Sequence, residues 1–127
     1  MSDKQLIMVV DDDESTRTIV RTILQSVGYA VETCSNGAEA LDRLKDIKPA
    51  LVILDIMMPE MSGYEVMVRM RQNPATQTIP AMFLSAKGDP SDLLSGYNDY
   101  CVEYYITKPF TAQQLLAGVK LIFDSAT

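Results

Sequence analysis

The 127-residue sequence contains no histidine. This absence excludes histidine as a general base, the Ser-His-Asp triad and most zinc sites, which depend on imidazole ligands. Any reactive group must therefore be a carboxylate, a lysine, a hydroxyl, a tyrosine or a thiol. Cysteine is also scarce: Cys34 and Cys101 have no metal-ligand spacing, and we expect both to be buried, reduced thiols.

Long apolar runs and excess positive charge are absent as well. No apolar run is long enough to span a membrane, and the first residues, MSDKQL, lack the apolar region of a signal peptide. We therefore expect a cytoplasmic protein without membrane insertion. The net charge of −6 argues against direct binding to nucleic acid. The length is that of one ordinary domain, so residues 1–127 are predicted to form a single domain with no output domain.

Short apolar segments alternate with segments of helical periodicity along the whole chain. The expected strands are 6–10, 30–34, 51–55, 81–84 and 104–107, and the expected helices are 15–27, 38–47, 64–71, 90–98 and 111–124. Strands separated by helices are typical of parallel sheets with right-handed crossovers. The sequence therefore predicts a three-layer α/β domain of the (βα)5, flavodoxin-like class, with a five-stranded parallel sheet covered by helices on both faces.

Polar residues stand at the ends of all five expected strands, and those at the first, third, fourth and fifth could meet. These are Asp11 and Asp12, Asp55, Ser85, and Lys108. In such sheets the functional site lies outside the carboxyl ends of the strands, so these side chains are expected to converge on one rim. Each residue alone has an ordinary structural explanation, such as a solvated acid, a turn cap or a surface lysine, and it is their joint placement that indicates a site.

The chemistry of this set indicates covalent phosphoryl transfer. Three close carboxylates raise one another's pKa unless a cation lies among them, and oxygen ligands in a partly solvated cleft suit Mg²⁺. A carboxylate is a known nucleophile toward phosphate, and Lys108 and Ser85 would offset or bind charge on the transferring oxygens.

Three other motifs fail, and one rival remains. The sequence lacks the P-loop pattern and the dinucleotide-binding glycine pattern, and a calcium loop starting at Asp11 would have Thr16 and Thr22 where glycine and an acid are required. The segment VVDDDES resembles the nucleophile motif of haloacid-dehalogenase-type phosphatases, in which Asp11 would be the nucleophile and Asp13 the acid/base. In the other interpretation Asp13 is a solvated residue or a helix N-cap.

Four segments together resemble the receiver domain of two-component response regulators over almost the whole chain. They are VVDDDES, LVILDIMMPEMSGYEV, FLSA and YYITKPF. The resemblance implies that Asp55 accepts a phosphoryl group and that Asp12 and Asp55 ligate Mg²⁺. It implies that Asp11 acts mostly through water, that the backbone carbonyl of Met57 completes the metal ligands, and that Lys108 pairs with the phosphoryl oxygens.

The same resemblance implies a switch and a set of partners. Ser85 would be the switch hydroxyl and Tyr105 the switch aromatic, acting on the face formed by the fourth helix, fifth strand and fifth helix. The Lys108–Pro109 peptide is commonly cis in the family. The donor would be a phosphohistidine on a histidine kinase or phosphotransfer protein, and a homodimer formed on phosphorylation is a further expectation. Such a domain is a phosphoacceptor rather than an enzyme, while a pseudo-receiver that binds a partner without phosphorylation is the alternative.

The sequence departs from the family pattern beside the expected site. Apolar Met57 and Lys87 occupy two positions that influence phosphoryl lifetime among receivers. Because Met57 cannot orient an attacking water, slow self-dephosphorylation is predicted. The segment between Ser85 and Lys108 is slightly longer than usual and carries Cys101 where glycine is common. Because this is the face that receivers normally use for output, the dimer and partner-binding modes of other receivers are not assumed for this chain. No motif identifies the cognate kinase, pathway or target.

Overall fold

A five-stranded parallel sheet forms the centre of the protein. The computed structural model describes residues 4–85 and 104–125. The strands lie in the order β2-β1-β3-β4-β5. Their bounds are β1 Leu6–Val10, β2 Ala30–Cys34, β3 Leu51–Asp55, β4 Ala81–Ser85 and β5 Tyr104–Thr107, and the helices are α1 Glu14–Ser26, α2 Gly37–Arg43, α3 Gly63–Gln72 and α5 Ala112–Ser125. The predicted α/β class and parallel sheet are confirmed.

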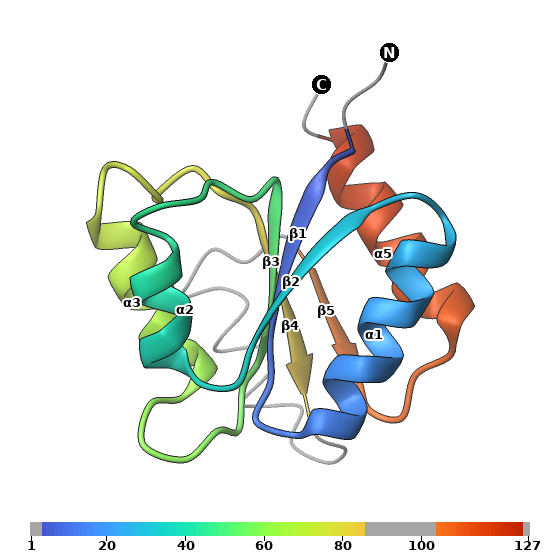
Figure 1. The fold of residues 1–127 in the computed structure, drawn as a ribbon, viewed down its shortest axis with the longest axis horizontal. Coiled ribbons are helices and arrows are strands. Elements are labelled where there is room, and N and C mark those ends of the chain that lie inside the picture. The colour runs from blue at the N-terminus through green and yellow to red at the C-terminus, as the bar shows by residue number, and fades with distance from the viewer. Residues whose placement is uncertain (1–3, 86–103, 126–127) are drawn as a thin grey trace.

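Helices cover both faces of the sheet, as Figure 1 shows in a view close to edge-on. Helices α1 and α5 lie on one side, and α2 and α3 lie on the other. Alternate residues of β1 supply the two cores: Met8 and Val10 belong to the core beneath α2 and α3, and Ile7 and Val9 belong to the core beneath α1 and α5. Burial on both sides explains why the central strands are continuous apolar runs rather than alternating ones.

Side-chain caps explain where the helices begin. Asp13, Asn36 and Ser62 precede α1, α2 and α3, and each accepts a hydrogen bond from the backbone N–H three residues later. These bonds satisfy donors that have no partner inside the helix. At the other end of α1, Gly28 has a φ of 99°, the left-handed conformation that glycine adopts without strain.

The second helix is shorter than the sequence predicted. The expected range was 38–47, but α2 ends at Arg43. Beyond it, the N–H groups of Lys45 and Asp46 donate to carbonyls only three residues earlier, so the chain leaves the α-helical ladder in a series of turns. The expected fourth helix, residues 90–98, lies outside the described residues.

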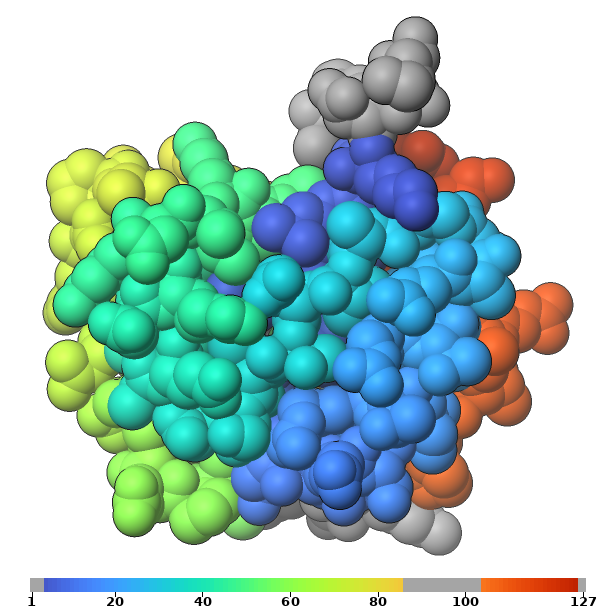
Figure 2. Space-filling view, in the orientation of Figure 1, coloured from blue at the N-terminus to red at the C-terminus, as the bar shows by residue number. Residues whose placement is uncertain are grey.

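The edge of the sheet at β2 faces the viewer in the space-filling view, with the side chains of α1 and α2 on either side of the strand (Figure 2). Cys34, the last residue of β2, is buried as expected, and burial raises the pKa of its thiol to about 11. Cys101 lies outside the described residues. Within residues 4–85 and 104–125, every helix is too short or too polar to cross a bilayer.

Candidate functional site

Three aspartates meet at the carboxyl ends of β1 and β3. The two strands are adjacent, and Val10 lies opposite Leu54, so Asp11 and Asp55 emerge side by side. Asp11 is fully buried and Asp55 almost so, whereas Asp12 is exposed. One carboxylate oxygen from each residue lies within 4.8 Å of the others. The predicted acidic cluster is therefore present in the structure.

Lys108 brings a positive charge to this cluster from the end of β5. Its Nζ lies 3.0 Å from Asp11 Oδ2 and 3.5 Å from Asp55 Oδ1. Burial opposes the charged amine, but the hydrogen bond to Asp11 and the negative charges of Asp55 and Asp11 prevail and raise the pKa of Lys108. Lys108 therefore remains charged and bridges the two buried carboxylates. The peptide between Lys108 and Pro109 is cis.

The ionised form of Asp55 is disfavoured despite this lysine. Burial and then the negative charge of Asp11 raise the pKa of Asp55 to about 7, while Lys108 acts in the opposite direction. One ammonium group does not neutralise three carboxylates. A further cation among the three acids would favour ionised Asp55 and lower its pKa.

The donor set fits Mg²⁺. All three side chains offer carboxylate oxygens, the ligand type this hard cation prefers, and the exposure of Asp12 leaves access for the waters that Mg²⁺ retains. Asp11, Asp12 and Asp55 are the residues that would hold the ion. In residues 4–85 and 104–125, this is the one group of three acidic or thiol side chains that lie close enough together to bind the same metal ion.

Ser85 is held near the same rim through the backbone. It is the last residue of β4, is buried, and lies opposite Thr107 of β5. The backbone N–H of Lys108 donates to the carbonyl of Ser85 across 2.7 Å. The structure therefore places the predicted hydroxyl residue beside the strand that carries the predicted lysine.

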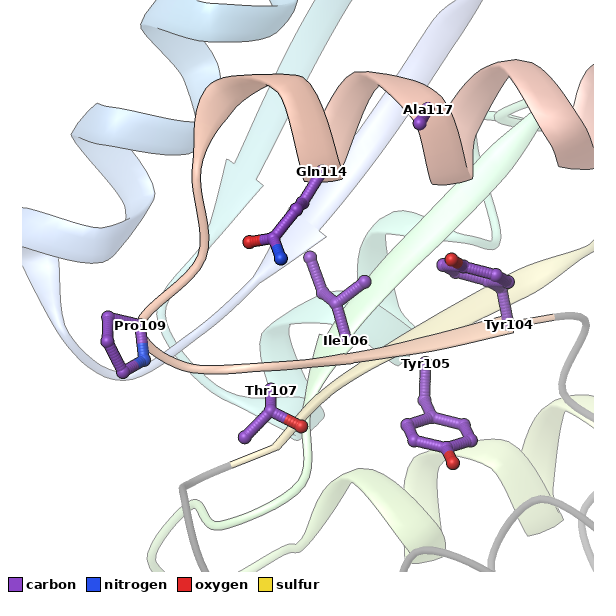
Figure 3. A pocket seen from close by; sticks show the side chains of 7 residues that line it. All are labelled: Tyr104, Tyr105, Ile106, Thr107, Pro109, Gln114 and Ala117. Atoms are coloured by element: carbon purple, nitrogen blue, oxygen red, sulfur yellow. The ribbon is translucent and has the colours of Figure 1, made fainter.

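The two tyrosines of β5 project to opposite faces of the sheet, as Figure 3 shows. The Tyr104 ring packs on the α5 side, where a Cβ at Gly118 would come within 2.8 Å of it. Tyr105 points to the other side and packs against the core beneath α2 and α3. A cavity of about 380 Å³ lies along this strand, lined by Tyr104, Tyr105, Ile106, Thr107, Pro109, Gln114 and Ala117.

Asp13 is not one of the three clustered acids, and its carboxylate is engaged at the start of α1 instead. Its Oδ2 accepts hydrogen bonds from the N–H and the hydroxyl of Thr16, at 3.2 and 2.7 Å. The bond from the Thr16 hydroxyl is the main reason that the pKa of Asp13 is lowered. The N-cap interpretation is thereby confirmed. The phosphatase interpretation needs a protonated acid at Asp13, and this geometry counts against it.

Sequence reasoning missed two residues that contact the site backbone. The Arg17 guanidinium of α1 donates to the carbonyl of Asp11 across 2.7 Å. Gly63, the first residue of α3, lies so close to β3 that a Cβ there would sit 2.5 Å from the carbonyl oxygen of Asp55. The sequence predicted a helix over 64–71, next to Gly63, but no pattern signalled either contact. Met57, in contrast, is exposed over 70% of its surface, beside the acids but outside the core.

Residues 7–120 match the response regulator receiver domain family. This chain belongs to that family. The receiver also resembles curated proteins at moderate identity. It is 39% identical to the phosphate regulon transcriptional regulatory protein PhoB of Rhizobium meliloti, over 94% of this chain and 52% of PhoB. It is 34% identical to protein PilG of Pseudomonas aeruginosa, over 99% of this chain and 93% of PilG.

Solved structures of receivers have the same fold. A putative response regulator from Chloroflexus aurantiacus superposes with a TM-score of 0.90 at 33% identity, covering 94% of this chain and 98% of that one. The chemotaxis protein CheY4 of Vibrio cholerae gives a TM-score of 0.87 at 27% identity, over 93% and 98% of the two chains. This chain spans about half the length of several curated transcriptional regulators that it matches.

Proposed function

We propose that this receiver accepts a phosphoryl group on Asp55 from a phosphohistidine of a histidine kinase or phosphotransfer protein. A carboxylate oxygen of ionised Asp55 attacks the phosphorus, the new P–O bond replaces the P–N bond to the imidazole, and the departing imidazole takes up a proton. The observation that carries the proposal is the buried carboxylate of Asp55, with two acids within 4.8 Å and the Lys108 ammonium at 3.5 Å.

The residues at this site have different proposed roles. Lys108 offsets negative charge on the transferring oxygens, and Asp11 holds Lys108 in place through the 3.0 Å contact. When bound, Mg²⁺ would neutralise the crowded acids and the phosphoryl oxygens. Asp12, Asp55 and the carbonyl of Met57 would hold the ion directly, and Asp11 would act mostly through water.

The signal is proposed to leave through β5 and α5 together with the segment that precedes them. The added charge and acceptor oxygens at Asp55 would draw the Ser85 hydroxyl, and the Tyr105 ring would change orientation in response. Output then occurs through protein contacts in the cytoplasm, with a separate target, a linked output domain or a second copy of the chain. Turnover is limited to slow self-dephosphorylation, so the domain is a phosphoacceptor rather than an enzyme acting on other molecules.

The test is labelling by a small acyl phosphate in the presence of Mg²⁺, followed by intact mass and peptide mapping. The wild-type protein should carry one phosphoryl group on Asp55, and Asp55→Asn should carry none. Asp12→Ala should nearly abolish labelling because a metal ligand is lost. Asp13→Ala is the matched control and should label almost normally, because Asp13 only caps α1.

Two outcomes would replace the proposal with its rivals. Labelling on Asp11 that survives Asp55→Asn would favour the phosphatase interpretation. A Mg²⁺ titration that produces no change in the resonances of Tyr105, together with no labelling, would identify a pseudo-receiver that only binds partners.

A further inference from the structure

Arg17 contacts the backbone of the acidic cluster from the first turn of α1. Its guanidinium Nη1 donates to the carbonyl oxygen of Asp11 across 2.7 Å, and the side chain is half-buried. A hydrogen bond from a charged donor at this distance is stronger than one between neutral groups. The bond reaches six residues back along the chain, across the turn that contains Asp12 and Asp13.

The remaining polar atoms of Asp11 are fixed by the fold. Its N–H donates to the carbonyl of Cys34 at 3.1 Å. Its Oδ1 accepts from the N–H of Asp13 at 2.9 Å, and its Oδ2 lies 3.0 Å from Lys108 Nζ. The carbonyl held by Arg17 belongs to the peptide that joins Asp11 to Asp12. Because that peptide is planar, fixing its carbonyl also fixes the direction in which Asp12 leaves the strand end.

We propose that Arg17 is a positioning residue of the metal site, because its bond to the Asp11 carbonyl orients the exposed Asp12 carboxylate toward Asp55. Of the three clustered acids, Asp12 is exposed, so packing does not hold its side chain as it holds the buried Asp11 and Asp55. This role rests on the proposed function, in which the three acids bind Mg²⁺. Groups that orient metal ligands without touching the metal commonly affect affinity strongly.

The positive charge of Arg17, considered alone, predicts the opposite effect on Mg²⁺ affinity. A guanidinium close to the acids repels a divalent cation, so if charge alone mattered, removing it would tighten Mg²⁺ binding. Loss of orientation would weaken binding instead. The sign of the change in affinity therefore separates the two roles.

The experiment compares Mg²⁺ affinity, measured by calorimetric titration of the metal-free protein, among variants of α1. Arg17→Met keeps most of the side-chain length but removes the donor, and it should weaken Mg²⁺ binding about 10-fold. Arg17→Lys keeps a donor of similar reach and should recover most of the affinity. Arg21→Met removes the same charge one helical turn further along, and it should bind like the wild type or slightly tighter.

Urea unfolding and backbone amide spectra complete the test. The amide resonances of Asp12 and Asp13 should shift in metal-free Arg17→Met, while those of the sheet residues should stay unchanged. If Arg17→Met does not fold, Arg17→Gln, whose amide is too short to reach the carbonyl, takes its place. A neutral variant that binds Mg²⁺ as tightly as the wild type, or a lysine variant as weak as the methionine variant, would overturn the positioning role.

The failure of the underlying function has a different signature. If the wild type itself does not bind Mg²⁺, or if Asp12→Ala leaves the affinity unchanged, the proposed metal site and the role of Arg17 are both overturned. Wild-type binding that depends on Asp12 but not on Arg17 overturns the inference alone.

Discussion

At the scale of the residue, Asp55 occupies a position that disfavours the form its proposed role requires. A nucleophile toward phosphorus must be ionised, yet burial and Asp11 raise the pKa of Asp55 to about 7. Lys108 offsets part of this effect. With a pKa of about 7, only about half of Asp55 is ionised near neutral pH, and a cation among the acids would raise that fraction. The proposed role therefore predicts faster labelling of Asp55 when a cation is bound.

Met57 is the exposed residue whose replacement should change the lifetime of the phosphoryl group. Its thioether cannot hold a water for attack on phosphorus, and its side chain is 70% exposed, so a polar side chain there would reach solvent beside Asp55. Met57→Asn adds a donor and an acceptor, and one such hydrogen bond to the attacking water should shorten the lifetime by about 2- to 10-fold.

The measurement is the decay of phosphorylated protein after removal of the donor, followed by intact mass. Met57→Leu is the control, since it is apolar like methionine, and its lifetime should match that of the wild type. A wild-type lifetime of only seconds, or an asparagine variant that decays no faster, would contradict the role assigned to Met57.

At the scale of the element, helix α3 begins directly against the end of β3. The N–H of Gly63 donates to the carbonyl of Ile56 at 2.9 Å. A Cβ at Gly63 would meet the Asp55 carbonyl at 2.5 Å and the Ile56 Cα at 3.0 Å. Both neighbours are backbone atoms, which cannot rotate away as a side chain can. The absence of a side chain at Gly63 therefore sets the position of the strand end that carries Asp55.

Gly63→Ala should move this strand end. Relief of the overlap requires a backbone shift, with a loss of about 1–3 kcal/mol in the free energy of unfolding and slower labelling of Asp55. Urea unfolding and acyl phosphate labelling measure the two effects. Gly118→Ala is the matched control: its Cβ would meet the Tyr104 ring at 2.8 Å, so it should lose stability but label at the wild-type rate. Equal labelling rates in the two variants would refute the contact argument.

The same elements explain what the sequence could and could not predict. Strands β1, β2, β3 and β5 have the predicted bounds. For β1 and β3 the reason is that doubly buried strands are short apolar runs that polar residues interrupt. The edge strands β2 and β5 are only partly buried, and turn residues and prolines between the segments marked their limits instead. The early end of α2 depends on backbone N–H groups that donate to carbonyls three residues earlier. No residue type in this segment requires that pattern, so the sequence could not predict it. The acids and lysine stood out because strand ends converge, whereas Arg17 reaches back along its own helix and Gly63 matters only through a tertiary contact.

At the scale of the whole molecule, the site exists only in the folded chain. Asp11 and Lys108 are 97 residues apart in sequence and 3.0 Å apart in space, and the acids come from two strands of one sheet. The unfolded chain cannot bring these groups together, so any ion bound among them stabilises the native state alone.

Removal of Mg²⁺ should therefore destabilise the protein in a manner that depends on pH. The pKa of Asp55 is raised from 3.8 to about 7 by folding, so the native state binds more protons between these values and stability falls as the pH rises through that window. Above about pH 7 the full penalty of the ionised acid is present, and a cation relieves it. At ten times its Kd, Mg²⁺ should add about 1.4 kcal/mol at pH 8.

Near pH 5, where Asp55 is mostly protonated in the native state, chelation of Mg²⁺ should change stability much less, because the proton and the metal compete for the same carboxylate. Urea unfolding with Mg²⁺ or with a chelator, at about pH 5 and pH 8, measures the four free energies. Asp55→Asn cannot ionise and should show a flatter pH profile with little response to Mg²⁺. Equal stabilisation by Mg²⁺ at both pH values in the wild type would place the ion away from Asp55. It would also contradict the predicted competition between the metal and the proton for this carboxylate.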